Sequence, residues 1–375
     1  MNIISKIVNS IDNGTVSFVQ SKFIKSVDCD ILLILGERAN GKSFAVKETV
    51  IKDAYYNDIQ FAYIRRYADD IKDYLINEYF EDVILNKNGH QYIKEWTNGE
   101  YSTITAYQKS IYFANYDEEK GRIIKGKKIG RMFGLSSAEH YKSLAFPGIK
   151  NLMYEEFITD GYYLGGNEPK KLLNLMSTIL RHEKGKLYCI GNKVSRICPY
   201  FGEWGLVNVP KQKIGTVDIY NLKDEDTTTR IGVYMTHTMA FNSGMFFGNA
   251  NKAISKGEWE TEEQPHIKGH RDDYKCIYTV VMKYDKNTFL CEFLQGVANP
   301  DLFTWYITPK TTPIQDNTRV VANSYNINPL CTIGFVALTP AENTIFNMLK
   351  QGKVCYSDNL TGTEFKQCFK MIKTV

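Results

Sequence analysis

Residues 31–43 read ILLILGERANGKS, and the order of apolar residues and glycines in this segment predicts the core of the fold. Its first five residues form an apolar run that stops at a glycine, which is typical of a buried strand in a parallel sheet. Beyond the loop, Val46, Val50 and Ala54 recur every fourth residue, which predicts that Ser43–Tyr55 is a helix with one face packed on that sheet. A strand, a glycine-rich loop and a helix are therefore expected in immediate succession.

The loop matches the pattern GxxxxGK[ST] of phosphate-binding loops. Without a Cβ, Gly36 and Gly41 let backbone amides turn inward around phosphate oxygens. Lys42 is expected to reach the β- and γ-phosphates of ATP, and the hydroxyl of Ser43 to bind Mg²⁺. A glycine turn with an incidental lysine is the alternative, but the flanking strand and helix favour a true phosphate loop. The expected nucleotide-binding residues of the loop are Gly36, Glu37, Arg38, Ala39, Asn40, Gly41, Lys42 and Ser43.

Residues 151–157 read NLMYEEF, an apolar strand that ends in two adjacent acids. Glu155 is predicted to hold Mg²⁺ together with Ser43, and Glu156 to act as the general base that polarises the attacking water. Most proteins with a phosphate loop have Asp at the first position. The longer glutamate leaves open whether it binds the metal directly or through water. A strand that runs into a solvated acidic turn is the alternative reading.

Further candidate site residues stand at the ends of predicted strands and of one predicted helix. Arg181 ends a predicted helix and is a candidate catalytic arginine for the γ-phosphate, acting in its own subunit or in a neighbour; a helix-end arginine favoured by the dipole is nearly as plausible. Asn192 follows the strand LYCIG and is a candidate γ-phosphate contact or a plain turn residue. Arg65 and Arg66 end another strand on the ligand side of a parallel sheet, as nucleotide or subunit contacts or as a solvated basic pair.

The composition is that of a folded chain with more than one domain. The sequence has 375 residues, of which 43% are hydrophobic and 23% are charged, and it contains no long apolar run that predicts a transmembrane helix. Eight scattered cysteines without a CxxC pair indicate free thiols in a reducing cytosol. The net charge of +4 permits a polyanionic partner but does not argue for one.

Strands alternating with helices predict an α/β domain with a mainly parallel sheet at the N-terminus. The pattern of the sequence changes after Gly202, where glycine, proline and lysine interrupt the periodicity of the apolar residues. We therefore expect a phosphate-loop ATPase domain over 1–205, a linker or hinge module over 206–268, and a smaller α/β domain over 269–375. A hairpin turning at Asp285–Asn287 is expected in the last of these.

Together these motifs resemble a known family. GERANGKS at 36–43, YIRRY at 63–67, the segment from Leu135 to Phe157 with YKSLAF before the acids, and LMSTILRHEKGKLYCIGN at 175–192 are similar to phage DNA-packaging ATPases. That family includes terminase large subunits and the shorter encapsidation proteins of small tailed phages with protein-primed genomes. The resemblance is good over residues 30–195 and thin beyond them.

The resemblance implies a motor that uses ATP and Mg²⁺ to push double-stranded DNA through the portal of a preformed procapsid. It further implies a homo-oligomeric ring, with five subunits expected, in the host cytoplasm and transiently at the portal vertex. A packaging RNA is a candidate further component, and no membrane is involved. The competing interpretations are another phosphate-loop motor on nucleic acid, such as a helicase or phage assembly ATPase, and a scaffolding protein that binds ATP but barely hydrolyses it.

The resemblance also implies a ribonuclease-H-like C-terminal domain. In full terminases its first strand carries a metal-binding Asp, but the corresponding strand here, Tyr278–Tyr284, reads YTVVMKY and has no acid. Asp272, Asp273 and Asp358 are expected to flank loops as surface acids. The sequence therefore predicts a vestigial nuclease domain that cuts no DNA.

Overall fold

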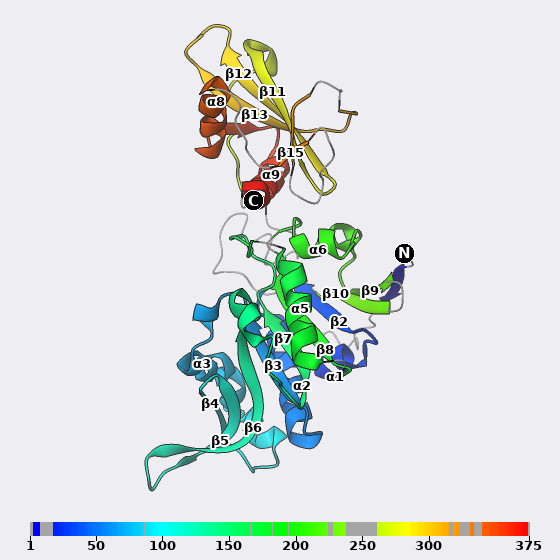
Figure 1. Cartoon of the computed structure of the whole chain (residues 1–375), viewed down its shortest axis with the longest axis vertical. Coiled ribbons are helices and arrows are strands. Elements are labelled where there is room, and N and C mark those ends of the chain that lie inside the picture. The colour runs from blue at the N-terminus through cyan, green and yellow to red at the C-terminus, as the bar shows by residue number, and fades with distance from the viewer. Residues whose placement is uncertain are drawn as a thin grey trace.

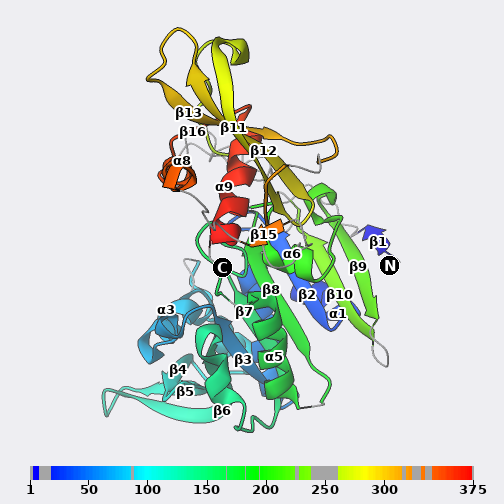
Figure 2. The same ribbon diagram turned by 45° about the horizontal axis from the view of Figure 1, so that its top comes forward.

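The structure is a computed structural model that describes residues 3–7, 18–85, 88–165, 167–181, 183–193, 195–223, 228–237, 261–314, 318–322, 331–333 and 340–373. These residues form two β-sheets with helices packed against them (Figure 1). The larger sheet is built from the N-terminal part of the chain and the smaller one from the C-terminal part. The two sheets occupy opposite ends of the molecule in both views (Figure 2).

The larger sheet has ten strands in the order β1-β9-β10-β2-β8-β7-β3-β6-β5-β4. The central strands from β10 to β6 run parallel, and antiparallel strands extend the sheet at both edges. The predicted α/β fold with a mainly parallel centre is therefore confirmed. The strand bounds are β1 Ile3–Ile7, β2 Ile31–Gly36, β3 Gln60–Arg65, β4 Thr103–Tyr107, β5 Ser110–Asp117, β6 Arg122–Gly134, β7 Ile149–Glu155, β8 Lys186–Asn192, β9 Thr216–Lys223 and β10 Thr228–Met235.

Helices cover both faces of this sheet, so its central strands are buried on both sides. One face packs against α1 Ser21–Ser26, α2 Lys42–Tyr56, α3 Asp73–Ile84 and α4 Tyr92–Trp96. The other face packs against the 3₁₀ helix η2 Leu135–Tyr141, α5 Glu168–Leu180 and α6 Pro199–Glu203. Short 3₁₀ turns, η1 Ala68–Asp70 and η3 Val209–Lys211, connect the elements.

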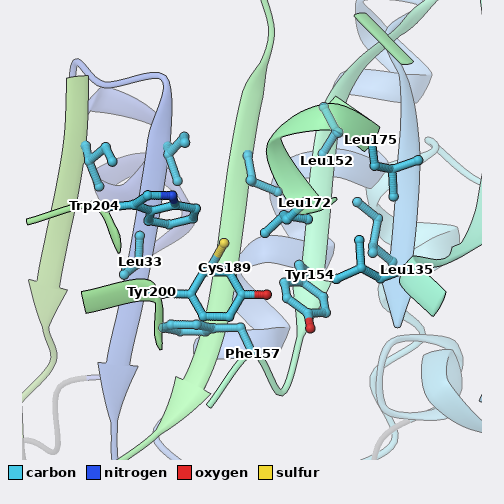
Figure 3. Close-up of a cluster of buried hydrophobic side chains, with 14 of the residues drawn as sticks. Leu33, Leu135, Leu152, Tyr154, Phe157, Leu172, Leu175, Cys189, Tyr200 and Trp204 are labelled. Atoms are coloured by element: carbon cyan, nitrogen blue, oxygen red, sulfur yellow. The ribbon is translucent and has the colours of Figure 1, made fainter. Parts of the chain in front are cut away.

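Strand β2 shows why the run ILLIL forms the middle of the sheet. Leu32 and Ile34 point into the core on the α2 side, whereas Leu33 and its alternate neighbours point into the core on the α5 side. Figure 3 shows Leu33 beside Trp204 in that second core. Each fully buried leucine or isoleucine contributes about 1.5–3 kcal/mol. A strand without one polar side chain is therefore stable only where both of its faces are covered.

The expected boundary at residue 205 is wrong, because the first sheet continues beyond it. Strand β10 pairs in parallel with β2, with Val233 opposite Leu33, and β9 pairs antiparallel with β10. These strands fall in the stretch 206–268 that was expected to be a linker. Glycine, proline and lysine before β9 break the sequence periodicity, but they form the connection from α6 to β9 and not a domain border. Residues 224–227 and 238–260 of the expected linker lie outside the described residues.

The smaller sheet has the order β15-β14-β11-β12-β13-β16, and the hairpin expected at Asp285–Asn287 joins β11 to β12. Strands β11, β12 and β13 are antiparallel, whereas β14 and β15 continue the sheet in parallel. Trp305 is fully buried in its core. The bounds are η4 Arg271–Asp273, β11 Tyr274–Tyr284, β12 Asn287–Gly296, β13 Phe303–Pro309, β14 Val320–Ala322, β15 Cys331–Ile333, α8 Pro340–Lys350, β16 Val354–Tyr356 and α9 Asn359–Lys373.

Across the described part of the chain, no helix combines the length and the apolar character that crossing a bilayer requires.

The corrected boundary makes a testable prediction about fragments. A fragment of residues 1–237 retains β9 and β10 and is expected to unfold in one cooperative thermal transition, measured by circular dichroism. A fragment of residues 1–205 leaves the edge of β2 unpaired and part of the core exposed, so it is expected to aggregate or to melt without cooperativity. Equal melting temperatures for the two soluble fragments would show that β9 and β10 are dispensable additions.

Candidate nucleotide-binding site

The predicted phosphate loop lies between β2 and α2, as expected. Gly36 ends β2, and a Cβ built on it would lie 1.8 Å from Oγ1 of Thr236 and 2.6 Å from Nδ2 of Asn40, so a larger residue would clash. Gly41 has a φ of 81° and caps α2, in a conformation that costs glycine nothing. The loop therefore wraps the start of α2, whose free N–H groups and positive dipole end favour an anion.

Lys42 is the first residue of α2, and its ammonium group is buried inside the loop. It donates to the carbonyl oxygen of Glu37 and, at 3.0 Å, to Oδ1 of Asn40. Burial lowers the pKa of Lys42 to about 7, although the nearby carboxylates of Glu155 and Glu37 act in the opposite direction. An anion bound in the loop would stabilise the charged lysine, since burial by itself disfavours it.

Glu155 ends β7 opposite the loop, and its buried carboxylate has two partners. Oε2 accepts a hydrogen bond from Ser43 Oγ at 3.2 Å, and Oε1 accepts one from the hydroxyl of Tyr79 on α3. The ammonium of Lys47 lies 4.0 Å from the centre of the Tyr79 ring and pairs with Asp82 at 2.8 Å. Burial raises the pKa of Glu155, and the hydrogen bond from Tyr79 partly offsets this effect. A serine hydroxyl beside a carboxylate oxygen is a donor set that fits Mg²⁺.

Glu156 follows β7 directly, but its side chain lies at the surface. Its backbone is left-handed, with a φ of 56°, and its side chain is 65% exposed. Oε2 of Glu156 accepts from Nη2 of Arg65, the last residue of β3, at 2.9 Å. The two adjacent acids of the sequence motif are therefore distinct in the structure: Glu155 is buried beside the loop, and Glu156 is solvated and held by an arginine.

Arg66 fixes the backbone of the same segment from inside the protein. Its guanidinium donates to the carbonyl oxygens of Glu156 at 3.1 Å and Phe157 at 2.8 Å, and its Nε contacts Glu168 at 3.0 Å. The sequence permits two interpretations of Arg65 and Arg66, as nucleotide or subunit contacts or as a solvated basic pair. The structure shows that Arg65 holds the side chain of Glu156, whereas Arg66 holds its backbone.

A cavity of about 810 Å³ opens over the loop, large enough for a nucleotide. Lys42, Ser43, Glu155, Glu156 and Asn192 all line it, so the structure brings these predicted site residues together. Arg38, Ala39, Asn40 and Gly41 also line the cavity, whereas Gly36 and Glu37 are not among its lining residues. The aromatic side chains at the cavity are those of Phe18, Phe44 and Tyr92.

Arg181 is the one predicted catalytic residue that the structure does not bring to this cavity. It caps the C-terminus of α5, and its guanidinium donates to the carbonyl oxygen of Leu144 at 2.8 Å. Helix α5 runs back from the carboxyl end of β7 to the start of β8. Its last residue therefore lies at the amino-terminal ends of the parallel strands, whereas the loop lies at their carboxyl ends. In this conformation Arg181 therefore lies away from the cavity of its own chain.

Sequence reasoning missed several residues at or beside the cavity. Tyr79, Phe18 and Tyr92 come from segments without a motif, and Thr236, which touches the loop through Asn40, lies far along the chain. Thr236 directly follows a strand, and this position was a usable signal, because β10 ends beside β2 and the loop. The sequence contains no comparable signal for Tyr79, whose role depends on how α3 packs.

Part of the chain matches a known family. The family described as Podovirus DNA encapsidation protein (Gp16) matches residues 86–227, which include Glu155, Glu156 and the end of β8. This part of the chain is therefore similar to that family. The resemblance to phage DNA-packaging ATPases is thereby confirmed.

Related proteins carry similar names. The DNA packaging protein of Bacillus phage B103 is 34% identical over 189 residues, which are 48% of this chain and 50% of that protein. The DNA packaging protein of Bacillus phage phi29 is 29% identical over 206 residues, 54% of each chain. The present chain thus matches about half the length of these curated relatives.

A solved structure extends the similarity of the fold to both sheets. The bacteriophage Phi-29 viral genome packaging motor assembly aligns with a TM-score of 0.51 at 20% identity, over 94% of this chain and 99% of that chain. At this identity the likeness concerns the fold alone, and it confirms the α/β architecture.

Proposed function

We propose that this chain is an ATP-hydrolysing motor that moves double-stranded DNA through a portal into a preformed phage procapsid. The observation that carries the proposal is the convergence of Lys42, Ser43, Glu155 and Glu156 on one cavity, in a chain similar to DNA packaging proteins. The implied setting is the host cytoplasm, at the portal vertex, within a homo-oligomeric ring of five subunits. A packaging RNA is a further proposed component.

The residues divide the chemistry among them. Lys42 and the loop amides would bind the phosphates of ATP, and Ser43 with Glu155 would hold Mg²⁺, which when bound neutralises phosphate charge. Glu156 would accept the proton of the attacking water. Asn192, at the end of β8 and on the cavity wall, would contact the γ-phosphate. Tyr79 acts through Glu155 and is a positioning residue.

The roles of Lys42 and Glu156 can be tested together. Lys42→Ala is expected to abolish hydrolysis and to weaken nucleotide binding, because it removes the positive charge at the β- and γ-phosphates. Glu156→Gln is expected to retain binding while turnover falls roughly 10²- to 10⁴-fold, the usual contribution of a general base. Phosphate release and binding of a fluorescent ATP analogue measure the two effects.

Undiminished turnover in Lys42→Ala would refute the phosphate-loop assignment. Loss of turnover in Glu155→Gln combined with full turnover in Glu156→Gln would reverse the roles of the two acids. Hydrolysis by the intact chain should also be stimulated by duplex DNA, and more strongly when empty procapsids are present. Stimulation that is indifferent to procapsids would instead favour another nucleic-acid motor.

Tyr79→Phe should show how Glu155 is oriented. The variant keeps the ring that Lys47 packs against but removes the hydroxyl that holds Oε1 of Glu155. A hydrogen bond to a charged group contributes about 1.5–3 kcal/mol, so we expect half-saturation of Mg²⁺-dependent nucleotide binding to require roughly tenfold more Mg²⁺. Binding without Mg²⁺ should not change.

A matched control is available in Tyr55→Phe. Tyr55 also donates its hydroxyl to a glutamate, Glu100, at 3.0 Å, but away from the cavity. Its loss should leave the Mg²⁺ titration unchanged. Equal shifts in the two variants would indicate a general loss of stability and would remove the positioning role from Tyr79.

Arg181 remains a proposed catalytic arginine that acts on the neighbouring subunit of a ring. Its place at the far edge of the sheet supports a role in trans, because its own cavity is beyond its reach. Mixing Arg181→Ala subunits with Glu156→Gln subunits should restore some hydrolysis, since some interfaces would then contain both intact groups. No recovery at any mixing ratio would assign Arg181 to a structural role.

We also propose that the chain has no nuclease activity. Three antiparallel strands, continued in parallel by β14 and β15 on one side and by β16 on the other, support the ribonuclease-H-like fold implied by the resemblance, and β11 offers no acid. Asp273 instead accepts from the backbone N–H of His270 at 2.8 Å, and Asp358 from that of Thr361 at 2.8 Å. Hydrogen bonds from Thr361 and Ser357 outweigh burial and lower the pKa of Asp358.

We therefore expect no nicking of supercoiled plasmid by the full chain with Mg²⁺ or Mn²⁺. Nicking that disappears when Asp272, Asp273 and Asp358 are changed to Asn would show an active nuclease.

A further inference from the structure

The antiparallel strands β4, β5 and β6 extend the first sheet, and the hairpin of β5 and β6 projects from the end of the molecule that is farthest from the second sheet (Figure 1). In their register, Tyr112 lies opposite Lys128, Ser110 opposite Arg131 and Ala114 opposite Lys125. Residues directly opposite one another share a face of a sheet. One face therefore gathers six large polar side chains, which we call the tyrosine–lysine face: Tyr107, Tyr112, Tyr116, Lys125, Lys128 and Arg131.

The other face of these strands is part of the core. Ile104, Ile111 and Phe113 are fully buried on the side of α2, α3 and α4. Lys127 points the same way, donates to the carbonyl oxygen of Ala54 at 2.8 Å and pairs with Asp58 at 2.9 Å. The strands thus have one face committed to the core and one face that remains accessible.

The tyrosine–lysine face is accessible and rich in hydrogen-bond donors. Tyr107 is 50% exposed and Tyr116 is 58% exposed. The ammonium of Lys125 lies 3.7 Å from the centre of the Tyr107 ring, which keeps both groups extended over the sheet. No carboxylate belongs to the face in the register of these strands, all of which the structure describes.

The positive charges of this face are not compensated within the chain. Lys127 and Lys120, in the same hairpin, pair with Asp58 and Asp117, but no ion pair among the described residues involves Lys125, Lys128 or Arg131. Burial and the neighbouring Arg131 lower the pKa of Lys128. Nε of Arg131 is buried without a hydrogen-bond partner in the described structure. Cations that repel one another with no acid between them fit a surface that meets a polyanion.

We propose that the tyrosine–lysine face binds the backbone phosphates of double-stranded DNA. Lysine, arginine and tyrosine hydroxyl groups are the usual donors to phosphate oxygens, and contacts of this kind hold a duplex without reading its sequence. A motor that moves along DNA requires such sequence-independent contact. The inference rests on the proposed function, and it assigns the DNA partner to a surface separate from the nucleotide cavity.

The test uses the full chain and a fluorescein-labelled duplex of mixed sequence, with binding followed by fluorescence anisotropy over a range of salt concentrations. The double variant Lys125→Ala with Lys128→Ala should bind roughly tenfold more weakly near physiological salt. The slope of the logarithm of the association constant against the logarithm of the salt concentration is negative, and its magnitude should decrease by about two, one for each phosphate contact that is lost. Hydrolysis without DNA should be unchanged, because neither lysine lines the cavity.

The control variant is Lys120→Ala with Arg122→Ala, which removes the same charge from the same hairpin. Lys120 pairs with Asp117 near the turn, and the register places Arg122 opposite Asp117, off the tyrosine–lysine face. This variant should keep the affinity and salt slope of the unchanged chain. A thermal unfolding curve for each variant shows whether it is folded.

Equal losses in the two variants would overturn the proposal, since general charge would then explain binding. Equal duplex binding by the unchanged chain and the lysine variant would also overturn it. The proposed function fails separately, when the unchanged chain does not hydrolyse ATP. The same set of proteins therefore tests the DNA-binding face and the proposed ATP hydrolysis separately.

Discussion

The buried ion pair between Arg66 and Glu168 holds the site together. The Glu168 side chain has no exposed surface, and its carboxylate accepts from the Tyr154 hydroxyl at 2.9 Å, the Tyr200 hydroxyl at 2.7 Å and the Leu164 backbone N–H at 2.6 Å, in addition to Arg66. One carboxylate thus joins β3, β7, α6 and the loop before α5. Removing one partner of such a pair costs about 3–5 kcal/mol, because the other charge is left buried. The geometry at the end of β7 depends on this pair.

This constraint explains how two adjacent glutamates acquire different environments. Arg66 fixes the carbonyl groups of Glu156 and Phe157, so the chain turns through a left-handed conformation immediately after β7. That turn directs Glu155 inward to Ser43 and leaves Glu156 at the surface beside Arg65. A buried carboxylate suits a metal ligand and a solvated one suits a proton acceptor. The different surroundings of the two acids, on which their proposed roles depend, therefore accompany the backbone conformation that Arg66 holds.

The sequence predicts the parts of the site that are local and misses those that depend on packing. The strand, loop and helix from Ile31 to Tyr55 and the two acids at the end of β7 follow from periodicity and spacing, and the structure agrees with them. Tyr79 was not predictable, because its contact with Glu155 depends on the position of α3. The boundary at residue 205 was wrong for a related reason. Strand β10 pairs with β2 and β9 pairs with β10, but nothing in the composition of these two strands indicates which strand they pair with.

The segment after Glu156 also touches the second part of the molecule. The carbonyl oxygen of Asp160, a residue of the cavity wall, accepts a hydrogen bond from Lys370 on α9, and Arg196 lies 4.0 Å from Glu364 on the same helix. Met371 of α9 packs against the core of the first sheet as well as against its own. A rotation of the second sheet relative to the first must break these contacts or move the segment 156–160. Because Arg66 anchors the beginning of that segment, such movement would be concentrated at its far end, on the cavity wall and not at the backbone of Glu156.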